Sequence, residues 1–356
     1  MENLPKLLII NPGSTSTKIA VFEQNNLVCE KKLTHTVDEL SAYPNVISQL
    51  GFRKDAILGV LSELGLTPSD FACIVGRGGL LAPIESGVYI INDKMIDQLR
   101  SGEYGEHASN LGALLASEIG NPHDIPAYIA DPVVVDELDD IARLSGHPEI
   151  ARISIFHALN HKAVGRQAAK SLGKPYDECN LIVTHMGGGI SVAAHKKGRC
   201  VDVNNALGGE GPYTPERAGG VSAFGLTDMC FSGQTKDEIK KKLVGKGGLS
   251  AYLHTNDCLQ VIDRIKNGDD YAKLVFEGMA YQTAKEIGAY STVLRGEIDA
   301  IVLTGGLAND KTLTGYITDM VKFIAPVMVF PGEDEMLALC EAGLRVIDKT
   351  EIPKII

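Results

Sequence analysis

Residues 181–195 read LIVTHMGGGISVAAH, in which two apolar runs flank three consecutive glycines, Gly187, Gly188 and Gly189. The runs predict two strands, and the glycines predict a tight turn between them. Because glycine has no Cβ, the backbone N–H groups of such a turn can approach and surround an anion. The segment is therefore either an ordinary β-hairpin or a turn that binds a polyphosphate.

A second segment near the N-terminus has the same form. Residues 7–22 read LLIINPGSTSTKIAVF, again with a small polar turn between apolar runs, about half a chain away in a protein of 356 residues. Residues 71–80 (FACIVGRGGL) and 298–307 (IDAIVLTGGL) form another pair, each an apolar strand that ends in Gly-Gly-Leu. The repeat predicts a diverged duplication of α/β class, with two halves that face each other across a cleft. The two turns of the second half lie farther apart in the sequence than the two turns of the first half, so the second half must carry an insertion.

Composition limits the classes of function. The hydrophobic and charged fractions, 44% and 22%, are ordinary for a soluble globular protein. The net charge of −11 and the lack of a basic run argue against binding to nucleic acid or to a membrane. A phosphate would therefore have to be attracted locally, by N–H groups, a few cations and a metal ion.

Cysteine usage and the chain start bear on location. The seven cysteines are scattered without a Cys-x-x-Cys pair, which predicts free thiols in a reducing compartment. Residues 1–6 have no basic signal region, and no apolar run reaches membrane-spanning length. We expect a cytoplasmic protein.

Hydrophobic periodicity predicts strands and helices in alternation. Further strands are expected at 27–33, 71–75, 125–130, 199–203, 298–303 and 327–330, and helices at 38–64 with a break near Pro44, 107–119, from Val134, 157–172, 226–243, 257–267, 270–294, from about Thr312, and up to Ile347.

Two charged residues follow predicted strands, where open α/β sheets place their ligands. Arg77 lies in Gly-Arg-Gly-Gly with little steric shielding, so it is either a ligand-binding arginine or a surface arginine in a turn. Asp131 is placed to reach a metal or an arginine, or else to cap the helix expected from Val134.

His157 and His161 stand four residues apart and share a helix face. Zinc pairs have the same spacing, but the glutamate and third ligand of a metalloprotease are absent. We favour an imidazole beside phosphate near the helix N-terminus, with one histidine that orients the other.

Two later segments suggest further contacts with ligands. Residues 204–220 (NNALGGEGPYTPERAGG) form a long loop with one arginine, Arg217, which indicates either an active-site loop or a structural Ω-loop. The pair Gly305-Gly306 between a strand and a helix would suit the adenosine end of a nucleotide. The acidic residues 333–335 either complement the dipole of the last helix or supply a metal ligand.

These motifs resemble the family of acetate and butyrate kinases, and butyrate kinases most closely. The likeness is carried by residues 10–18, by His185 with Gly187–Gly189, and by the loop at 208–217. It implies the duplicated actin-like ATPase fold shared with sugar kinases and the Hsp70 ATPase domain, with an active-site cleft between the halves. It also implies reversible transfer of phosphoryl from ATP to a carboxylate, giving acyl phosphate and ADP, with Mg²⁺.

The resemblance assigns domains and roles. It implies an N-terminal acyl-kinase domain at 1–155 and a nucleotide-binding domain at 156–335, with the option that a final helix at 336–356 packs back on the first. The implied phosphate and nucleotide residues are Asn11, Ser14, Ser16, Lys18, Gly187, Gly188, Gly189, Gly305 and Gly306, the catalytic ones are Arg77, Arg217, His157, His185 and Asp131, and the metal ligands are Glu335, Asp131 and Asn11. A homodimer or higher homo-oligomer is expected.

The sequence departs from acetate kinases in three respects. Gly188 stands where those enzymes have asparagine, the residues after Asp131 differ, and so does the length. These departures favour butyrate or a branched four- to five-carbon acid over acetate or propionate.

Two other classes stay open. A sugar or hydroxyl kinase of the same superfamily would need a carboxylate base at its acceptor oxygen. A nucleotide-driven binding module would answer to a protein partner and would not need both arginines. The sequence contains no Gly-x-x-x-x-Gly-Lys-Ser/Thr motif, which excludes a P-loop enzyme.

Overall fold

In a computed structural model, which describes residues 4–356, the chain divides into two compact units. Unit 1 runs to Val135 and includes Asp334–Ile356, and unit 2 is Asp136–Glu333. Residues 136–155, which we expected in the first domain, thus belong to unit 2. The segment that begins at Asp334, and with it the last helix, belongs to unit 1.

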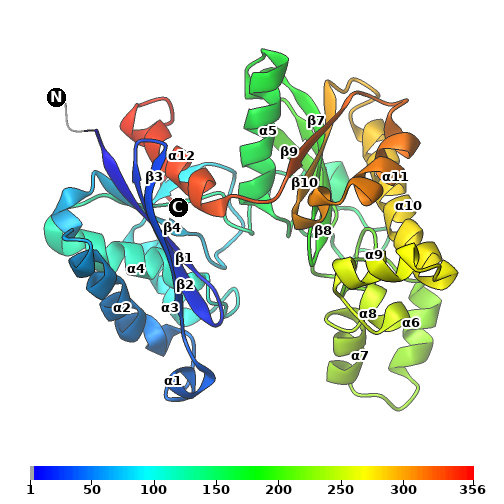
Figure 1. Cartoon of the computed structure of the whole chain (residues 1–356), viewed down its shortest axis with the longest axis horizontal. Helices are drawn as coiled ribbons and strands as arrows, with labels where there is room; N and C mark the ends of the chain where they lie inside the picture. The colour runs from blue at the N-terminus through cyan, green and yellow to red at the C-terminus, as the bar shows by residue number, and fades with distance from the viewer. Residues whose placement is uncertain (1–3) are drawn as a thin grey trace. The chain divides into compact units, whose positions relative to one another are not determined.

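Unit 1 contains a six-stranded mixed sheet with the strand order β3-β2-β1-β4-β6-β5 (Figure 1). The strands are β1 (Lys6–Pro12), β2 (Ser16–Glu23), β3 (Asn26–Thr34), β4 (Cys73–Arg77), β5 (Val88–Ile90) and β6 (Ala127–Ala130). The first three strands pair antiparallel, whereas β1, β4 and β6 run parallel. Since parallel strands end at one edge, Asn11 of β1 and Arg77 of β4 come to lie near each other.

Helices pack on both faces of this sheet. The helices of unit 1 are α1 (Val37–Ser41), α2 (Leu50–Glu63), α3 (Asp93–Ser101), α4 (Asn110–Gly120) and α12 (Glu335–Ile347), with 3₁₀ turns at Ile47–Gln49, Pro68–Asp70 and Asn121–His123. Leu8 and Ile10 of β1 share a core with α2 and α4, whereas Leu7 lies against Gly343 of α12. Alternate residues of a strand point to opposite faces, so β1 must be apolar on both.

Unit 2 contains a five-stranded sheet with the order β11-β10-β7-β8-β9. Its strands are β7 (Asn180–Met186), β8 (Ile190–Lys196), β9 (Arg199–Val203), β10 (Ala300–Gly305) and β11 (Val327–Pro331). The antiparallel pair β7–β8 has the glycine turn at its tip, as the sequence predicts.

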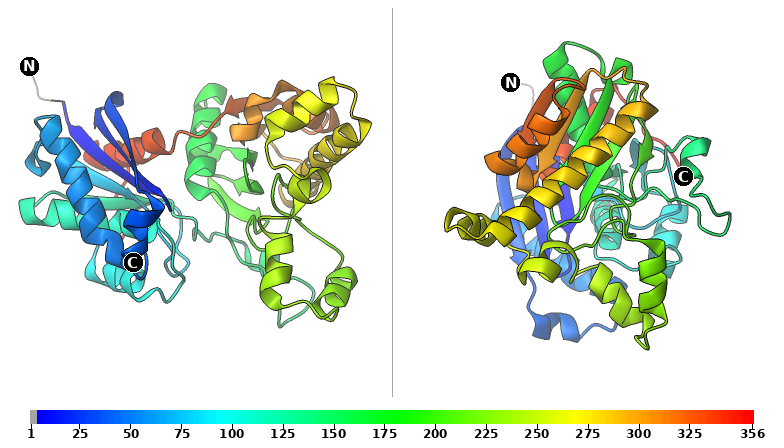
Figure 2. Two further views of the ribbon diagram at one scale, coloured as in Figure 1. Left: turned by 60° about the horizontal axis from the view of Figure 1, so that its bottom comes forward. Right: turned by 90° about the vertical axis from the view of Figure 1, so that its right-hand side faces the viewer.

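Seven helices belong to unit 2 within the described residues. They are α5 (Ala158–Leu172), α6 (Ala223–Cys230), α7 (Lys236–Leu243), α8 (Gly248–Leu253), α9 (Cys258–Lys266), α10 (Asp270–Val293) and α11 (Lys311–Val321), with 3₁₀ turns at Asp140–Arg143, Tyr176–Glu178 and Gly306–Asn309. Ile182 shares a core with α10 and α11, whereas Val183 faces α5 (Figures 1 and 2). The β7 strand is therefore buried on both faces.

The two sheets repeat one topology. Strands β3-β2-β1-β4-β6 in unit 1 correspond in order and direction to β9-β8-β7-β10-β11 in unit 2. Each unit thus begins with an antiparallel meander whose first strand continues into a parallel pair. The predicted duplication of an α/β unit is confirmed.

Three expected helices differ from the structure. The helix at 38–64 is replaced by α1, a 3₁₀ turn and α2, and the helix at 226–243 divides into α6 and α7 because Gly233 adopts φ +86°. The helix from Val134 is wrong: Asp131 has φ +40°, and Val135 instead forms a bridge with Ile84. Strand β5 and helices α3 and α8 lie in segments where we expected neither.

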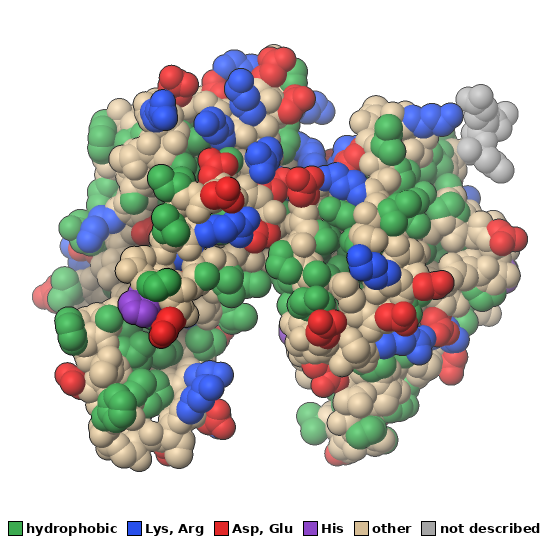
Figure 3. Space-filling view, turned by 180° about the vertical axis from the view of Figure 1, so that it is seen from behind, with side chains coloured by type: hydrophobic (Ala, Val, Ile, Leu, Met, Phe, Trp, Pro, Cys, Tyr) green, Lys and Arg blue, Asp and Glu red, His purple; other side chains and the backbone are tan. Residues whose placement is uncertain are grey.

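The surface carries charges of both signs. Figure 3 shows acidic and basic side chains interspersed over the face that it draws, without a basic patch. Within residues 4–356, no helix is both long enough and apolar enough to span a membrane.

Candidate active site

Asn11, Arg77 and Glu335 form a polar cluster in unit 1. Arg77 Nη2 lies 2.9 Å from Glu335 Oε1, and Nη1 donates to Glu335 Oε2 at 3.1 Å, so the ion pair is bidentate. Asn11 Nδ2 donates to the same Oε2 at 2.7 Å, and its Oδ1 lies 3.3 Å from Arg77 Nη1. Three of the predicted site residues, which lie far apart in the chain, thus contact one another; their roles stay predictions.

Local structure explains this convergence. Asn11 and Arg77 directly follow Ile10 and Gly76, which are paired in the parallel ladder of β1 and β4. This pairing brings Asn11 and Arg77 to one sheet edge. Glu335 is the first residue of α12, and Asp334 caps that helix by accepting from the N–H of Leu337 at 2.9 Å. A carboxylate in the first helical turn is favoured by the helix dipole.

The turn after β1 leaves several predicted phosphate contacts accessible. Ser14 and Lys18 are exposed, and Ser16 is half-buried. Lys18 Nζ lies 4.0 Å from Glu30 on the neighbouring strand. This ion pair is exposed and therefore weak, so it leaves the lysine available to an anion.

Asp131 follows β6 in a strained conformation. Its side chain is 2% exposed, and Oδ1 accepts from Ser86 Oγ at 2.6 Å and from the N–H of Gly87 at 2.8 Å. A positive φ is uncommon for a residue with a side chain, and such strain is often kept at functional sites. The observed contacts show that the carboxylate also fixes the 86–87 turn.

In unit 2, Arg217 lies against the glycine turn. A Cβ added to Gly189 would overlap Arg217 Nη1 and touch His157 Cε1, so only glycine leaves room for the guanidinium. Nη1 donates to the carbonyl of Ala206 at 2.6 Å. Burial lowers the pKa of Arg217, but a guanidinium remains charged at any physiological pH.

The arginine loop is fastened to the same turn. Thr214 Oγ1 donates to the carbonyl of Gly188 at 2.7 Å and accepts from the N–H of Arg217 at 3.0 Å. At the start of the loop, Asn204 Oδ1 accepts from the N–H of Val192 on β8 at 2.7 Å. The loop is thus ordered against the sheet at both ends.

His157 and His185 stack beside the turn, with ring centroids 3.8 Å apart and planes 13° from parallel. Asn160 Oδ1 lies 2.8 Å from His185 Nδ1 and favours the tautomer with its proton on Nδ1, in which Nε2, 3.5 Å from Glu333 Oε2, is an acceptor when the ring is neutral. Burial, followed by His157 and His161, holds the pKa of His185 well below its ordinary value. His185 could therefore donate to a phosphate only if the anion's charge favoured the protonated ring.

Sequence reasoning missed a polar chain behind these rings. Ser191 Oγ lies 2.9 Å from His157 Nδ1 and 2.8 Å from His161 Nε2. His161 Nδ1 lies 3.3 Å from His195 Nε2, and His195 Nδ1 lies 2.9 Å from the hydroxyl of Tyr176. A signal was present in the sequence, because Ser191 and His195 are four apart on β8 and so share one face.

The predicted adenosine turn has a close backbone approach. Gly305 adopts φ +89°, and a Cβ there would overlap the backbone of Met186. Gly306 opens a 3₁₀ turn that precedes α11, so the strand-turn-helix order is as expected.

The unit 1 cluster fits a magnesium ion in its chemistry. Within residues 4–356, no three His, Cys, Asp or Glu side chains converge on a common point. Magnesium, however, is commonly held by one or two carboxylates, water and phosphate oxygens. The carboxylate of Glu335 and the amide oxygen of Asn11 are donors of that kind.

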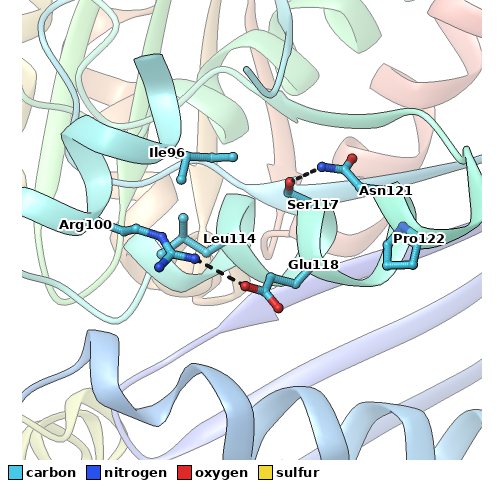
Figure 4. A pocket seen from close by; sticks show the side chains of 7 residues that line it. All are labelled: Ile96, Arg100, Leu114, Ser117, Glu118, Asn121 and Pro122. Atoms are coloured by element: carbon cyan, nitrogen blue, oxygen red, sulfur yellow. Dashed lines mark hydrogen bonds and ion pairs between the residues drawn. The ribbon is translucent and has the colours of Figure 1, made fainter. Parts of the chain in front are cut away.

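A surface hollow of about 280 Å³ lies elsewhere in unit 1 (Figure 4). Its polar side chains pair with one another: Arg100 Nη2 donates to Glu118 Oε1 at 3.2 Å, and Asn121 donates to Ser117 at 2.9 Å. None of the predicted site residues lines it.

Comparison with known proteins gives the family and the fold of the chain. The acetokinase family model matches residues 149–327, half of the chain. An acetate kinase from Porphyromonas gingivalis is 20% identical with a TM-score of 0.79, covering 96% of this chain and 100% of its own. A propionate kinase from Francisella tularensis is 19% identical with a TM-score of 0.75, covering 95% and 98%.

A ROK hexokinase from Thermus thermophilus is 13% identical with a TM-score of 0.50, covering 96% and 100%. These structural likenesses extend the actin-like ATPase fold to both units, and the family match identifies the chemistry. The chain belongs to the acetokinase family, and is accordingly an ATP-dependent phosphotransferase with a carboxyl group as acceptor.

Proposed function

We propose that this protein reversibly transfers the γ-phosphoryl group of ATP to a short-chain fatty acid, butyrate or a branched acid of four to five carbons. The observation that carries the proposal is Arg217. Its Nε is buried and, within the described part of the chain, has no hydrogen-bond partner. A buried donor without a partner costs about 1–3 kcal/mol, which binding of an anion would relieve.

The acceptor needs no general base, because a carboxylate is already an anionic nucleophile. The difficulty is to bring one anion against another. In the proposed reaction, Arg77 and Arg217 neutralise the carboxylate and the transferred phosphoryl group and hold them in line. Electrostatic stabilisation of this kind supplies most of the rate in phosphoryl transfer.

Residues of each unit are assigned contacts with the nucleotide in this proposal. Asn11, Ser14, Ser16 and Lys18 would contact the phosphates, as would the turn Gly187, Gly188 and Gly189, while Gly305 and Gly306 would lie near adenosine. Magnesium, when bound, would reduce the charge of the phosphate oxygens. Glu335 and Asn11 would hold that ion, with Asp131 as a further ligand or as the anchor of the 86–87 turn.

The two stacked histidines would contact the phosphoryl group. A neutral His185 accepts at Nε2, so donation to phosphate requires uptake of a proton when the anion binds. Ser191 bonds His157 from behind and fixes the plane of its ring. Both histidines therefore act in the proposal as positioned phosphate contacts and not as bases.

A hydroxylamine-trapping assay tests the proposal. Purified protein would receive ATP, magnesium and each carboxylate from two to five carbons, straight and branched, with excess EDTA and a polyol as controls. We expect hydroxamate with four- and five-carbon acids, less with acetate and propionate, and none with EDTA. ADP release with the polyol but hydroxamate with no acid would refute it.

The proposal includes a cytoplasmic homo-oligomer without nucleic-acid or membrane partners. The compartment is proposed from the seven cysteines, which are free thiols, the lack of nucleic-acid and membrane partners from the acidic composition, and the homo-oligomer from the likeness to the kinase family. Sedimentation of the purified protein would measure the oligomeric state.

A further inference from the structure

The turn after β1 is held by Arg53, a residue of α2 that the sequence analysis did not single out. Its side chain is 1% exposed, although it carries a full charge. We propose that Arg53 is a positioning residue whose buried guanidinium holds the Gly13–Ser16 turn in a form that binds phosphate. The inference rests on the proposed function, in which this turn contacts ATP.

Arg53 bonds the backbone of the turn directly. Its two Nη atoms donate at 2.9 to 3.1 Å to three carbonyl oxygens, those of Gly13, Ser14 and Ser16. The fourth carbonyl, that of Thr15, accepts from the N–H of His35 at 2.8 Å. All four carbonyl oxygens of the turn are therefore directed into unit 1.

This orientation matters for binding an anion. A carbonyl oxygen repels a phosphate, whereas N–H groups and hydroxyls attract it, so a phosphate-binding turn must direct its carbonyls away from the ligand. Here the side chains of Ser14 and Thr15 are exposed while their carbonyls face Arg53 and His35. The guanidinium also places a positive charge, little screened by water, directly behind the turn.

The guanidinium is itself fixed on its other side. Nε and Nη2 donate to Gln49 Oε1 at 3.1 and 2.8 Å, and Nη1 donates to Thr17 Oγ1 at 3.0 Å. The hydroxyl of Thr17, which accepts from Arg53, also lies 2.9 Å from His35 Nε2 and links the guanidinium to that ring. Burial and the nearby arginine lower the pKa of His35, which agrees with a neutral ring.

Lysine cannot replace this arrangement. It offers a point charge at the end of a flexible stem, whereas the planar fork serves three carbonyls, an amide and a hydroxyl at once. R53K should therefore keep the charge but release the turn, which separates the two effects of the side chain.

The test compares R53K with two variants of the same helix. K54Q removes a charge at the adjacent position, and I57V loosens the core beneath α2 without touching the turn. We would measure the Kd of ADP by calorimetry, and KM for ATP and for the carboxylate by kinetics, at a temperature where all variants are folded. R53K should raise both nucleotide constants about tenfold or more, because the turn is misplaced, while KM for the carboxylate changes less than twofold.

The controls decide between positioning and mere stability. If I57V lowers the melting temperature as much as R53K but leaves ADP affinity unchanged, the effect of Arg53 is on the turn. Equal ADP affinity in R53K and wild type, or equal losses in R53K and I57V, would overturn the inference, as would wild-type protein that binds no ADP. If wild type binds ADP but phosphorylates no carboxylate, the proposed function fails while the ADP comparison still tests Arg53.

Discussion

The two arginines at the candidate site differ in what holds them. Arg77 is paired on both Nη atoms with Glu335, whereas Arg217 keeps a buried Nε without a partner in the described chain. An anion that reached Arg77 would have to compete with a carboxylate, or draw that carboxylate to a metal ion. Arg217 would have to give up one side-chain hydrogen bond among residues 4–356, that to the carbonyl of Ala206. Replacement of Arg217 is therefore the clearest test of a catalytic arginine in this protein.

Replacement of Arg217 by alanine should lower kcat by roughly 10³-fold or more, the scale for loss of an arginine that stabilises phosphoryl transfer. Lysine should restore little of this, because it cannot supply a planar fork. Steady-state hydroxamate formation measures both variants. Arg100, which lines the surface hollow of unit 1, is a matched control whose alanine variant should stay within twofold. Near-normal turnover in R217A would remove this residue from the mechanism.

Buried histidines should make stability depend on pH. Burial holds the pKa values of His161, His185 and His195 well below their ordinary range, so the folded state keeps them neutral. The unfolded chain takes up these protons below about pH 6.5. The stabilisation that comes from keeping these rings neutral should thus be complete above that pH. As the pH is lowered, the free energy of unfolding should fall by up to about 1.4 kcal/mol per pH unit for each histidine.

Urea unfolding at several pH values from 7.5 to 5.5 measures this slope. H195Q should reduce the slope relative to wild type, because one buried imidazole fewer resists protonation. H147Q replaces an exposed histidine of the same unit and should leave the slope unchanged. Equal slopes in all three proteins would show that His195 is not kept neutral by folding.

At the scale of elements, the glycine turn between β7 and β8 is shaped by what lies on it. Gly189 is covered by Arg217 and His157, whereas a Cβ on Gly188 would meet only Glu216 at an ordinary contact distance of 3.5 Å. The two glycines therefore serve different purposes, although the sequence presents them as equivalent.

G189A should lower kcat by about 10²-fold with little loss of stability. The added methyl group would displace the far end of a flexible arginine side chain, which is cheap for folding but costly for alignment of the reacting groups. G188A is the matched control and should keep at least half of the activity. Kinetics together with thermal melts would distinguish a loss of activity from a loss of stability. An active G189A would show that the guanidinium of Arg217 can act from another position.

The strands and the glycine turn could be predicted because their signals are local. Apolar runs bounded by glycine identified the turn of Gly187, and a lone arginine among glycines singled out Arg77, whose role stays a prediction. Arg53 could not be found in this way, because its bonds to the turn join α2 to residues about forty positions earlier. The helix expected from Val134 failed for a similar reason, since Ser86 and Gly87 hold Asp131 in a conformation that no helix can follow.

At the scale of the molecule, duplication gives two sheets of one topology that carry different chemistry. In unit 1, Asn11 and Arg77 lie at the ends of the parallel strands β1 and β4, and in unit 2, His185 and the glycine turn lie at the end of β7. The segments that are similar between the halves, 7–22 with 181–195 and 71–80 with 298–307, consist of strands and turns, where backbone geometry is under constraint. The side chains at the strand ends differ between the units, and the proposed function assigns them contacts with different groups of the substrates.

The preferred acid is a property of the whole enzyme, and steady-state kinetics with several acids test the proposed preference directly. We expect butyrate or isobutyrate to exceed acetate in kcat/KM, because each additional buried methylene contributes about 0.8 kcal/mol and two together give roughly tenfold. The comparison should be made at saturating ATP, so that differences in nucleotide binding do not enter, and with propionate as the intermediate point. A progressive rise from two to four carbons would indicate an apolar pocket that the longer chain fills. A kcat/KM for acetate equal to or above that for butyrate and isobutyrate would make the protein an acetate-preferring member of its family, with the roles proposed for Arg77 and Arg217 unchanged.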